Sequence, residues 1–324
     1  MAFTIYSQEL GVSKATGSHE MQGFLQKTSR TFALTIPMLP ESLRTEIGVA
    51  YLLFRIIDTF EDATNWEPSK RVDALKNFVR LLDEADDDHA ARIAAGWVQD
   101  PPVVQPAYLE LLGAAPRVVE WHRGLAPGAR SQIRQHLERS ALGMCQFVLR
   151  TDGQGVLRLK TMQDLRDYCF AVAGIVGQLL TELFLMGGQG RLAEAAGELR
   201  GRSVQFGEAL QIVNILKDAG GDAAEGRVYL PRDVLLAEVF LLARADLRAA
   251  IEYTELLRAF GAPPGLVAFN AVNARLAIAA LRLMRDRGLG SKLGRSDVLG
   301  IAADVMHAIE AGTPLFAPAD LNHS

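Results

Sequence analysis

The sequence Tyr51-Leu-Leu-Phe-Arg-Ile-Ile-Asp-Thr-Phe-Glu-Asp62 is an apolar stretch that ends in three acids. As a helix it places Asp58 and Asp62 on one face, about 6 Å apart along the axis, with Glu61 beside them. Arg55 falls on the same side, where its guanidinium can pair with a carboxylate or contact a phosphate. The other side chains are apolar nearly all round, as in a helix buried in a bundle. Because buried acids are costly without a compensating cation, the stretch indicates a metal site.

The composition predicts an all-α protein. Of the 324 residues, 49% are hydrophobic, Ala, Leu and Arg dominate, and β-branched or aromatic clusters at period two are scarce. Nothing in the composition marks a division into two domains. We therefore expect one domain over residues 21–312, between a flexible N-terminal tail (1–20) and a C-terminal tail (313–324).

Charge and cysteine content exclude several classes of protein. The formal charge of −4 shows no basic excess, which argues against a nucleic-acid binder. Cys145 and Cys169 are too few for a disulfide framework or a cysteine-based zinc site, and they suit a reduced cytoplasmic interior. Residues 1–20 lack the pattern of a signal peptide, and polar residues interrupt the most apolar span, 170–188. An integral membrane protein is not expected.

Prolines, glycines and capping residues divide the chain into predicted helices. They are expected at about 21–27, 40–62, 69–82, 127–150, 161–186, 192–218, 244–260, 264–287 and 296–312, with two more between Pro101 and Pro127. Thr161 and Asp164 form a predicted capping box. The glycines at 187–190 indicate a helix end rather than a phosphate-binding loop.

Not every acidic run has the character of 51–62. Residues 83–88 are denser in acid but lie among polar residues, which predicts a solvated helix end or loop. By contrast, the helix expected over 192–218 is apolar and continues into a second acidic pattern. Its stripe of polar side chains has steps of three, four and four: Gln211, Asn214, Asp218 and Asp222. Gly220 and Gly221 make the last turn pliable, so Asp222 is expected beyond the regular helix.

Two acid pairs on apolar helices suit a pocket in which the helices face each other. Carboxylate ligands select hard cations, and Mg²⁺ is usually held by carboxylates together with substrate phosphate. Such a pocket could ionise an allylic diphosphate in a dry, apolar cavity. The aromatic faces of Phe32, Tyr51 and Tyr168 could stabilise the resulting cation. Spacing alone leaves a second interpretation open, in which each pair is a helix-surface cluster compensated by arginine.

The chain also resembles the squalene and phytoene synthase family over about residues 21–289. Four blocks carry the resemblance: 29–33 (Ser-Arg-Thr-Phe-Ala), 51–62, 168–177 (Tyr-Cys-Phe-Ala-Val-Ala-Gly-Ile-Val-Gly) and 211–231, which runs from Gln-Ile-Val-Asn-Ile-Leu-Lys-Asp to Gly-Arg-Val-Tyr-Leu-Pro. The resemblance implies a single-domain, all-α isoprenoid-synthase bundle around a central cavity that takes two prenyl diphosphates.

The resemblance also implies roles for individual residues. The Mg²⁺-binding set would be Asp58, Glu61, Asp62, Asn214, Asp218 and Asp222. The diphosphate-binding set would be Ser29, Arg30, Arg55, Gln211, Asn214, Lys217 and Arg227. Tyr51 and Tyr168 would line the cavity near the cation, and the four aspartates, Asp58, Asp62, Asp218 and Asp222, would act in catalysis through the metal.

The implied reaction is a head-to-head condensation. One substrate ionises, the double bond of the other captures its allylic cation, and a cyclopropyl diphosphate forms and rearranges to a linear terpene. The first acidic block is closer to squalene synthases than to plant-type phytoene synthases. We expect farnesyl diphosphate as substrate, presqualene diphosphate as intermediate, and squalene or a related C30 product.

Three departures from the family pattern leave alternatives open. Gly221 stands where an acid is common, and Lys217 where arginine is common. Residues 269–273 (Phe-Asn-Ala-Val-Asn) differ from the pattern of reducing members, so NADPH use stays open. The alternatives are a C30 product made without reductant, phytoene from geranylgeranyl diphosphate, prenyl transfer to another acceptor, and a non-catalytic assembly or binding module. With no membrane anchor expected after Pro314, we predict a cytoplasmic enzyme that reaches its lipid substrate at a membrane surface.

Overall fold

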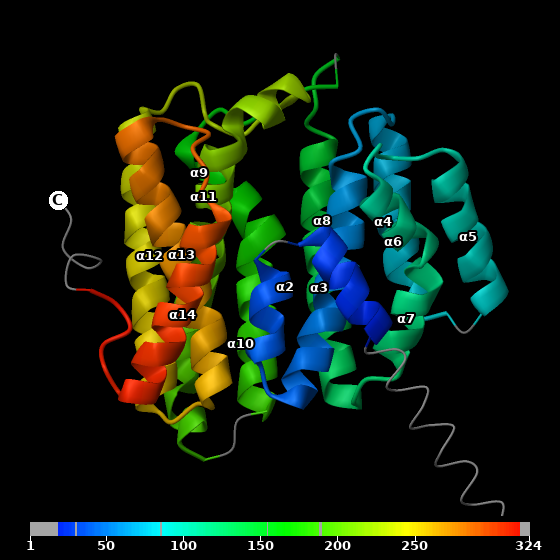
Figure 1. The fold of residues 1–324 in the computed structure, drawn as a ribbon. Coiled ribbons are helices and arrows are strands. Elements are labelled where there is room, and N and C mark those ends of the chain that lie inside the picture. Colours follow the sequence, from blue (N-terminus) through cyan, green and yellow to red (C-terminus); the bar gives the residue numbers. More distant parts are fainter. Residues whose placement is uncertain (1–18, 30, 85, 154, 188–189, 318–324) are drawn as a thin grey trace, which may run out of the picture.

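Buried helices dominate the computed structural model, which describes residues 19–29, 31–84, 86–153, 155–187 and 190–317. Residues 19–28 are helical, and the elements that follow are α2 (Phe32–Thr35), η1 (Ile36–Met38), α3 (Glu41–Glu61), α4 (Pro68–Leu81), α5 (Asp87–Gln99), α6 (Pro106–Gly113), α7 (Ala115–Arg123), α8 (Pro127–Val148), β1 (Leu157–Arg158), α9 (Met162–Cys169), η2 (Phe170–Gly174), α10 (Ile175–Gly187), η3 (Gly190–Ala195), α11 (Ala196–Ala224), β2 (Arg227–Val228), α12 (Leu236–Ala259), α13 (Pro264–Arg287) and α14 (Arg295–Ala311). The predicted all-α class is confirmed. Figure 1 shows α3, α8, α10 and α11 in the middle of the bundle, α12–α14 on one side and α4–α7 on the other.

Helix α3 is the buried centre that its sequence predicted. Leu52, Leu53, Ile56, Ile57 and Phe60 have no exposed surface, and the helix packs against α4, α7 and α8. Burying one such side chain stabilises a fold by about 1.5–3 kcal/mol. The acids at the C-terminal end of α3 are therefore held in place by rigid apolar packing.

The acidic run at 83–88 is solvated, as predicted. The Asp83 carboxylate accepts hydrogen bonds from Nε and Nη2 of Arg134, and Asp86 caps the N-terminus of α5 by accepting from the His89 amide. The Asp87 side chain is 80% exposed where it pairs with Arg123. A dense run of acids without apolar neighbours therefore lies at the protein surface here.

Close helix packing explains two glycines in the centre of the molecule. A β-carbon on Gly177 would stand 2.0 Å from the carbonyl oxygen of Ser203, and one on Gly207 would stand 2.2 Å from that of Ala173. These glycines bring the α10 segment and its preceding π-helical turn, η2, against the backbone of α11.

Thr161 caps α9 through the predicted capping box with Asp164.

Helix α11 is longer than predicted. It continues through Gly220 and Gly221 to Ala224, so the expectation that Asp222 lies beyond the helix is wrong. The amide of Glu225 still donates to the Gly221 carbonyl at 3.1 Å. Each glycine costs a helix only about 1 kcal/mol, less than is needed to break a long cooperative helix. Helix α12 also begins earlier than expected, at Leu236, where Glu238 accepts a hydrogen bond from the Leu235 amide.

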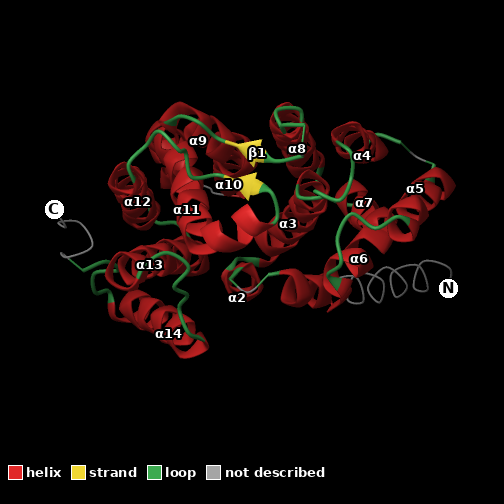
Figure 2. Cartoon of the chain, turned by 90° about the horizontal axis from the view of Figure 1, so that it is seen from above, coloured by secondary structure: helices red, strands yellow, loops and turns green. Residues whose placement is uncertain are grey.

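A short parallel strand pair was not predicted. Leu157 of β1 pairs with Arg227 of β2, and Arg158 pairs with Val228. The Leu157 amide donates to the Gly226 carbonyl at 3.0 Å, and Gly226 has a positive φ of 82° that favours glycine. Figure 2 shows the pair beside α8 and α9. This pairing positions Arg227 at the end of the bundle.

The chain termini differ in part from the predicted tails. Residues 19 and 20 already belong to the first helix, and residues 1–18 lie outside the described part of the chain. Leu315 and Phe316, within the predicted C-terminal tail, are buried in the hydrophobic core. By length and composition, Met162–Gly187 and Pro264–Arg287 could each cross a membrane. Their most apolar windows are 44% and 78% buried inside the protein, and the second is mostly buried, as in a core helix.

Candidate active site

The acidic ends of α3 and α11 meet at one arginine. Arg227 Nε lies 3.2 Å from Asp62 Oδ1, without hydrogen-bond geometry, and Nη2 lies 3.1 Å from Asp222 Oδ1. The same Nη2 donates to Glu225 Oε2 at 2.8 Å. Only 10% of the arginine side chain is exposed. The structure therefore brings the two acidic patterns together, although 160 residues separate Asp62 from Asp222 in the sequence.

Asp58 lies one turn before Asp62 on α3. Arg55 Nη1 is 3.6 Å from Asp58 Oδ2, and the Asp58 side chain is 31% exposed. Burial raises the pKa of Asp58, the charge of Arg55 lowers it and the charge of Asp62 raises it, and together they bring this pKa to about 6. Arg55 therefore offsets only part of the cost of burying this carboxylate.

On the α11 side, Asp218 binds two lysines. Lys292 Nζ lies 2.8 Å from Asp218 Oδ1, and Lys217 Nζ lies 3.5 Å from Oδ2. Lys217 also donates to Asn214 Oδ1 at 2.6 Å. The pKa of Asp222, one turn further on, is raised chiefly by burial, and Arg227 lowers it. Basic side chains thus compensate the acids of both helix ends.

Glu61 lies deeper than its neighbours. It is 3% exposed, and its Oε1 has no hydrogen-bond partner among the described residues. Burial raises its pKa well above the ordinary value, as does the charge of Asp62, while Arg71 lowers it. Arg71 donates to the Glu61 backbone carbonyl. Of the predicted metal ligands, Glu61 is the most enclosed and is favoured in its neutral form.

Two tyrosines form a buried pair beside the acids. The hydroxyl of Tyr168 donates to that of Tyr229 at 2.9 Å, and the rings stack with centroids 4.5 Å apart. Burial raises the pKa of both hydroxyls, and the charge of Glu61 raises both further. Phe147 meets the Tyr168 ring edge-on at 5.2 Å. Tyr168 therefore lies close to the acids at the end of α3.

Tyr51 and Arg55 belong to a second aromatic cluster, earlier on α3 than Asp58. The Tyr51 hydroxyl donates to the Thr28 carbonyl at 2.9 Å and accepts from Arg55 Nε at 3.3 Å. The Arg55 guanidinium lies over the rings of both Tyr51 and Tyr108, 5.6 and 5.7 Å from their centroids. Phe32 packs against Tyr51 with centroids 5.5 Å apart. Arg55 is thus positioned by aromatic faces and by Asp58.

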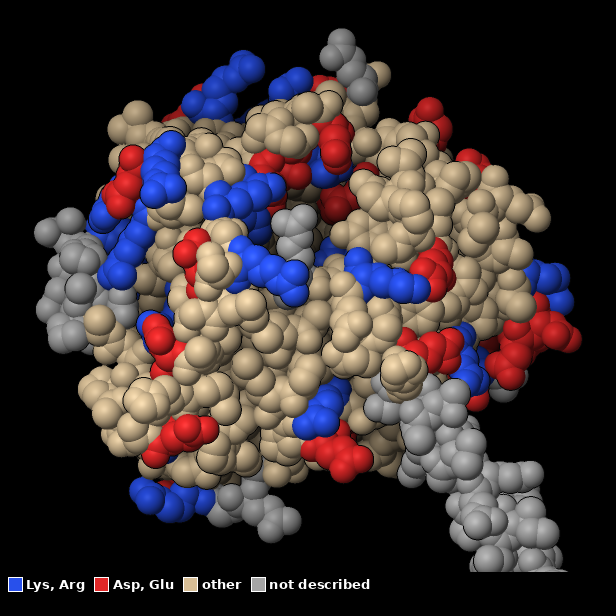
Figure 3. Space-filling view, in the orientation of Figure 1, with Lys and Arg blue, Asp and Glu red and all other residues tan. Residues whose placement is uncertain are grey.

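Three predicted residues remain, and the structure describes two of them, Ser29 and Gln211. Ser29 Oγ accepts a hydrogen bond from the Phe32 amide at 2.9 Å. Gln211 is half-buried on α11, one turn before the exposed Asn214. Arg30 lies outside the described residues. Figure 3 shows a recess in the upper part of this face, rimmed by acidic and basic side chains.

Sequence reasoning missed Lys292, Arg71 and Tyr229 as residues of this region. Tyr229 lay in the block 211–231 and could have been included there. Lys292 follows α13 in a short segment where Gly288 and Gly290 have φ values of 94° and 82°. A lone lysine among glycines after a long helix is a weak signal. Its contact with Asp218 depends on how that segment turns back.

The donor types fit Mg²⁺, which prefers carboxylate oxygens. Within the described ranges, no three His, Cys, Asp or Glu side chains converge as a metal cluster, because basic side chains lie between the acids. The raised pKa values of Asp58 and Asp222 show that these basic groups leave part of the burial cost uncompensated. A divalent cation would supply the missing positive charge.

The two acidic helix ends and their shared arginine belong to a helical bundle. The family model of squalene/phytoene synthase matches residues 25–291. The chain belongs to the squalene/phytoene synthase family, a family of prenyltransferases.

Curated relatives and solved structures agree with this assignment. The squalene synthase of Saccharomyces cerevisiae is 29% identical over 241 residues, 72% of this chain and 48% of that protein. Squalene synthase BSS of Botryococcus braunii is 31% identical over 238 residues, 71% of this chain and 47% of that protein. The chain thus spans about half the length of these relatives.

The fold matches solved enzymes of the same family. The complex of TcSQS with the ligand E5700 superimposes with a TM-score of 0.69 at 24% identity, covering 89% of this chain and 85% of that one. A dehydrosqualene synthase in complex with ligand gives a TM-score of 0.60 at 18% identity, covering 92% of this chain and 98% of that one. At these identities the likeness shows the fold alone.

Proposed function

We propose that this protein catalyses the Mg²⁺-dependent head-to-head condensation of two molecules of farnesyl diphosphate, through presqualene diphosphate, to a C30 terpene. The observation that carries the proposal is the position of Arg227 between Asp62 and Asp222. It brings two acidic helix ends to one basic cluster, where two diphosphates and their metal ions could be bound. The similarity to squalene synthases supports the same reaction.

In this mechanism, Asp58, Asp62, Asp218 and Asp222 would hold Mg²⁺. When bound, Mg²⁺ neutralises the diphosphate and so assists its departure. Arg55, Arg227, Lys217 and Lys292 bind phosphate oxygens, for which guanidinium and ammonium groups are suited. Because Arg227 now contacts carboxylates, it would exchange part of these contacts for phosphate when substrate binds.

The reaction begins when the carbon–oxygen bond of one substrate breaks and its diphosphate leaves with the electron pair. The double bond of the second substrate attacks the allylic cation, a proton is lost, and a cyclopropane ring closes. The aromatic faces beside the acids, Tyr51, Phe32 and Tyr168, stabilise positive charge and exclude water. The buried face of α3 keeps this region apolar.

A second candidate product is a dehydrogenated or hydroxylated C30 compound made without NADPH. Residues 269–273 favour it, because this part of α13 is buried. Asn273 donates to the Phe269 carbonyl at 2.7 Å, and Phe269 packs against Phe32. Helix α13 thus presents a packed core face there, not exposed polar groups for a nicotinamide.

One experiment separates these products from the remaining alternatives. Purified protein is incubated with Mg²⁺ and with farnesyl or geranylgeranyl diphosphate, with and without NADPH, and pyrophosphate and lipid products are measured. We expect C30 products from farnesyl diphosphate. C40 product from geranylgeranyl diphosphate alone would instead indicate phytoene synthesis, and turnover only with an added acceptor would indicate prenyl transfer. No pyrophosphate release under any condition would overturn the proposal in favour of a binding module.

We further propose a cytoplasmic location, in keeping with two free, buried cysteines.

A further inference from the structure

A groove between α12 and α13 lies outside the acidic site. Ten residues line it, and none of them is acidic. Four are arginines: Arg244, Arg248, Arg282 and Arg285. The other six are apolar, so the groove combines basic side chains with an apolar floor.

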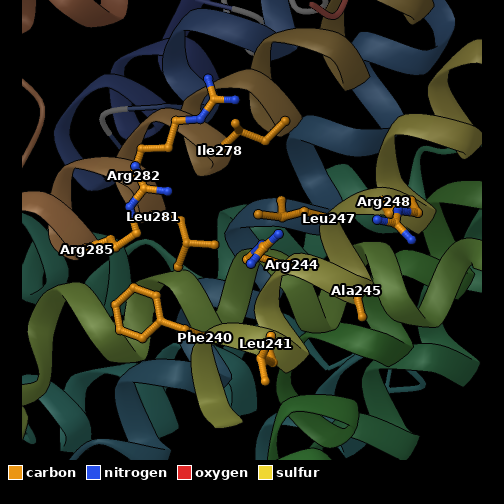
Figure 4. A pocket seen from close by; sticks show the side chains of 10 residues that line it. All are labelled: Phe240, Leu241, Arg244, Ala245, Leu247, Arg248, Ile278, Leu281, Arg282 and Arg285. Carbon is orange, nitrogen blue, oxygen red and sulfur yellow. The ribbon is translucent and has the colours of Figure 1, made fainter. Parts of the chain in front are cut away.

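The four arginines of the groove come from two neighbouring helices. Arg244 and Arg248 are one turn apart on α12, and Arg282 and Arg285 are one turn apart on α13, so each pair shares a helix face. Figure 4 shows the two pairs on the two helices, with Leu281 in the space between Arg285 and Arg244, and Phe240 and Leu241 lower in the view. Arg285 Nε lies 2.9 Å from Oδ1 of the neighbouring Asp286. Guanidinium groups that line a groove attract anions such as phosphate.

Exposed leucines continue the groove toward the start of α12. Leu241, which lines the groove, is 59% exposed, and Leu235 and Leu236 are 73% and 43% exposed. Large apolar side chains framed by arginines are typical of surfaces that lie on a membrane. The arginines suit phosphate headgroups, and the leucines suit the acyl chains beneath them.

The net charge of the protein contrasts with the basic side chains of the groove. The formal net charge is −4, so the chain as a whole is repelled by an anionic surface. Any attraction must come from a confined basic region. Figure 3 shows Lys and Arg side chains gathered on the upper left of the molecule, where α12 and α13 lie in Figure 1.

The groove also lies at the same end of the bundle as the acidic site. Arg285 is in the last turn of α13, and seven residues further on Lys292 contacts Asp218. A membrane bound at the groove would therefore lie near the site where a substrate with a hydrocarbon tail would enter.

We propose that the α12–α13 groove docks the protein on the phosphate headgroups of an anionic membrane surface, with Leu235, Leu236 and Leu241 inserted among the lipids. The docking stands apart from the proposed reaction, because no group of the acidic site takes part in it.

The test is sedimentation of the full chain with lipid vesicles. Wild-type protein should bind phosphatidylcholine vesicles that contain phosphatidylglycerol, should bind pure phosphatidylcholine vesicles weakly, and should be released by salt. Arg244→Glu/Arg285→Glu should lower the binding about tenfold or more. The matched control is Arg80→Glu/Arg92→Glu, which makes the same charge change on α4 and α5, on the opposite side of the bundle. It should bind within about twofold of wild type, since screening confines the effect to charges near the membrane.

Each result decides the question. No binding of wild type to anionic vesicles, or equal losses in the two double variants, overturns the proposal. The proposal is also overturned if vesicles do not bind while calorimetry shows that inorganic diphosphate binds and that the groove substitutions abolish this binding. If circular dichroism shows that Arg244→Glu/Arg285→Glu unfolds the protein, Arg244→Gln/Arg285→Gln is used instead, and the same loss of vesicle binding is expected. Asp58→Asn should bind vesicles like wild type, which separates this test from that of the reaction.

Discussion

The Nζ of Lys292 lies 2.8 Å from Oδ1 of Asp218. This lysine follows α13, just beyond the residues that match the family model, and it contacts an acid expected to bind metal. The contact places the segment between α13 and α14 against the second acidic helix end. An ammonium group there can bind diphosphate oxygen once a metal ion occupies the carboxylate.

Lys292→Ala should raise the KM for the prenyl diphosphate about tenfold, because one phosphate contact is lost. Thermal unfolding should be nearly unchanged, since the lysine is 54% exposed and such pairs add little stability. Steady-state kinetics and circular dichroism measure the two effects. Lys76→Ala, at an exposed position of α4, is the control. Unaltered KM in Lys292→Ala would show that the lysine serves Asp218 alone.

Asp58→Asn and Asp218→Asn should each lower turnover by about a thousandfold or more while the helical signal stays intact, because each removes a carboxylate from the metal-binding set. Pyrophosphate release measures turnover, and circular dichroism measures folding. Glu138→Gln, a surface change on α8, controls for loss of one negative charge. Wild-type activity in either aspartate variant would refute the metal assignment.

The raised pKa of Asp58 also predicts a pH dependence. The folded-state pKa of about 6 lies above the ordinary value of 3.8, so the native state binds more protons between these values. Stability should therefore fall as pH rises through this window. In chelator-treated protein, Asp58→Asn should be more stable than wild type above pH 6, by on the order of 1 kcal/mol after screening, and equal below about pH 4. Urea unfolding at several pH values measures this difference, and a difference independent of pH would contradict it.

Arg227→Gln should destabilise the metal-free protein by about 3 kcal/mol, because it leaves Asp62 and Asp222 facing each other without their shared cation. Added Mg²⁺ should then raise the melting temperature more in this variant than in wild type. Differential scanning calorimetry with and without Mg²⁺ tests both statements. Arg202→Gln, which removes an exposed ion pair between α11 and α12, is the control and should respond to Mg²⁺ as wild type does. The same Mg²⁺ response in all three proteins would argue against a metal between the two helix ends.

Gly177→Ala should destabilise the fold by roughly 3 kcal/mol or more, since its new methyl group would overlap the Ser203 carbonyl. Gly201→Ala is the matched change on α11, where nothing lies within 4 Å of the added carbon. It should stabilise the protein by about 0.5–1 kcal/mol through helix propensity. Chemical denaturation of both variants decides the matter. Similar effects in the two would show that the close approach of the helices relaxes easily.

The sequence predicted the parts of the fold that depend on local pattern. Helix α3 follows from its apolar residues, and α9 begins at Thr161 because a capping box is a local arrangement. The extension of α11 to Ala224 was not foreseen, since the cost of two glycines is local but the stability of the helix is cooperative.

The candidate site was predictable in its acids and less so in its bases. Asp58, Asp62, Asp218 and Asp222 stand out by their spacing on apolar helices. The position of Arg227 depends on strand pairing with Leu157, 70 residues away, and no short-range pattern encodes that contact. Lys292 reaches Asp218 through a turn whose direction depends on glycine conformations. Contacts between distant segments are therefore what the structure adds.

The strand pair that carries Arg227 is short enough to open alone. Its cross-strand bonds include those from the amides of Leu157 and Leu159, whereas α3 is a buried helix of 21 residues. Local opening costs far less free energy than global unfolding, so these two amides should exchange with solvent deuterium well before those of α3. The guanidinium between the acidic helix ends is therefore attached to a labile backbone, and it can turn from carboxylate to incoming phosphate while the helices around it keep their places.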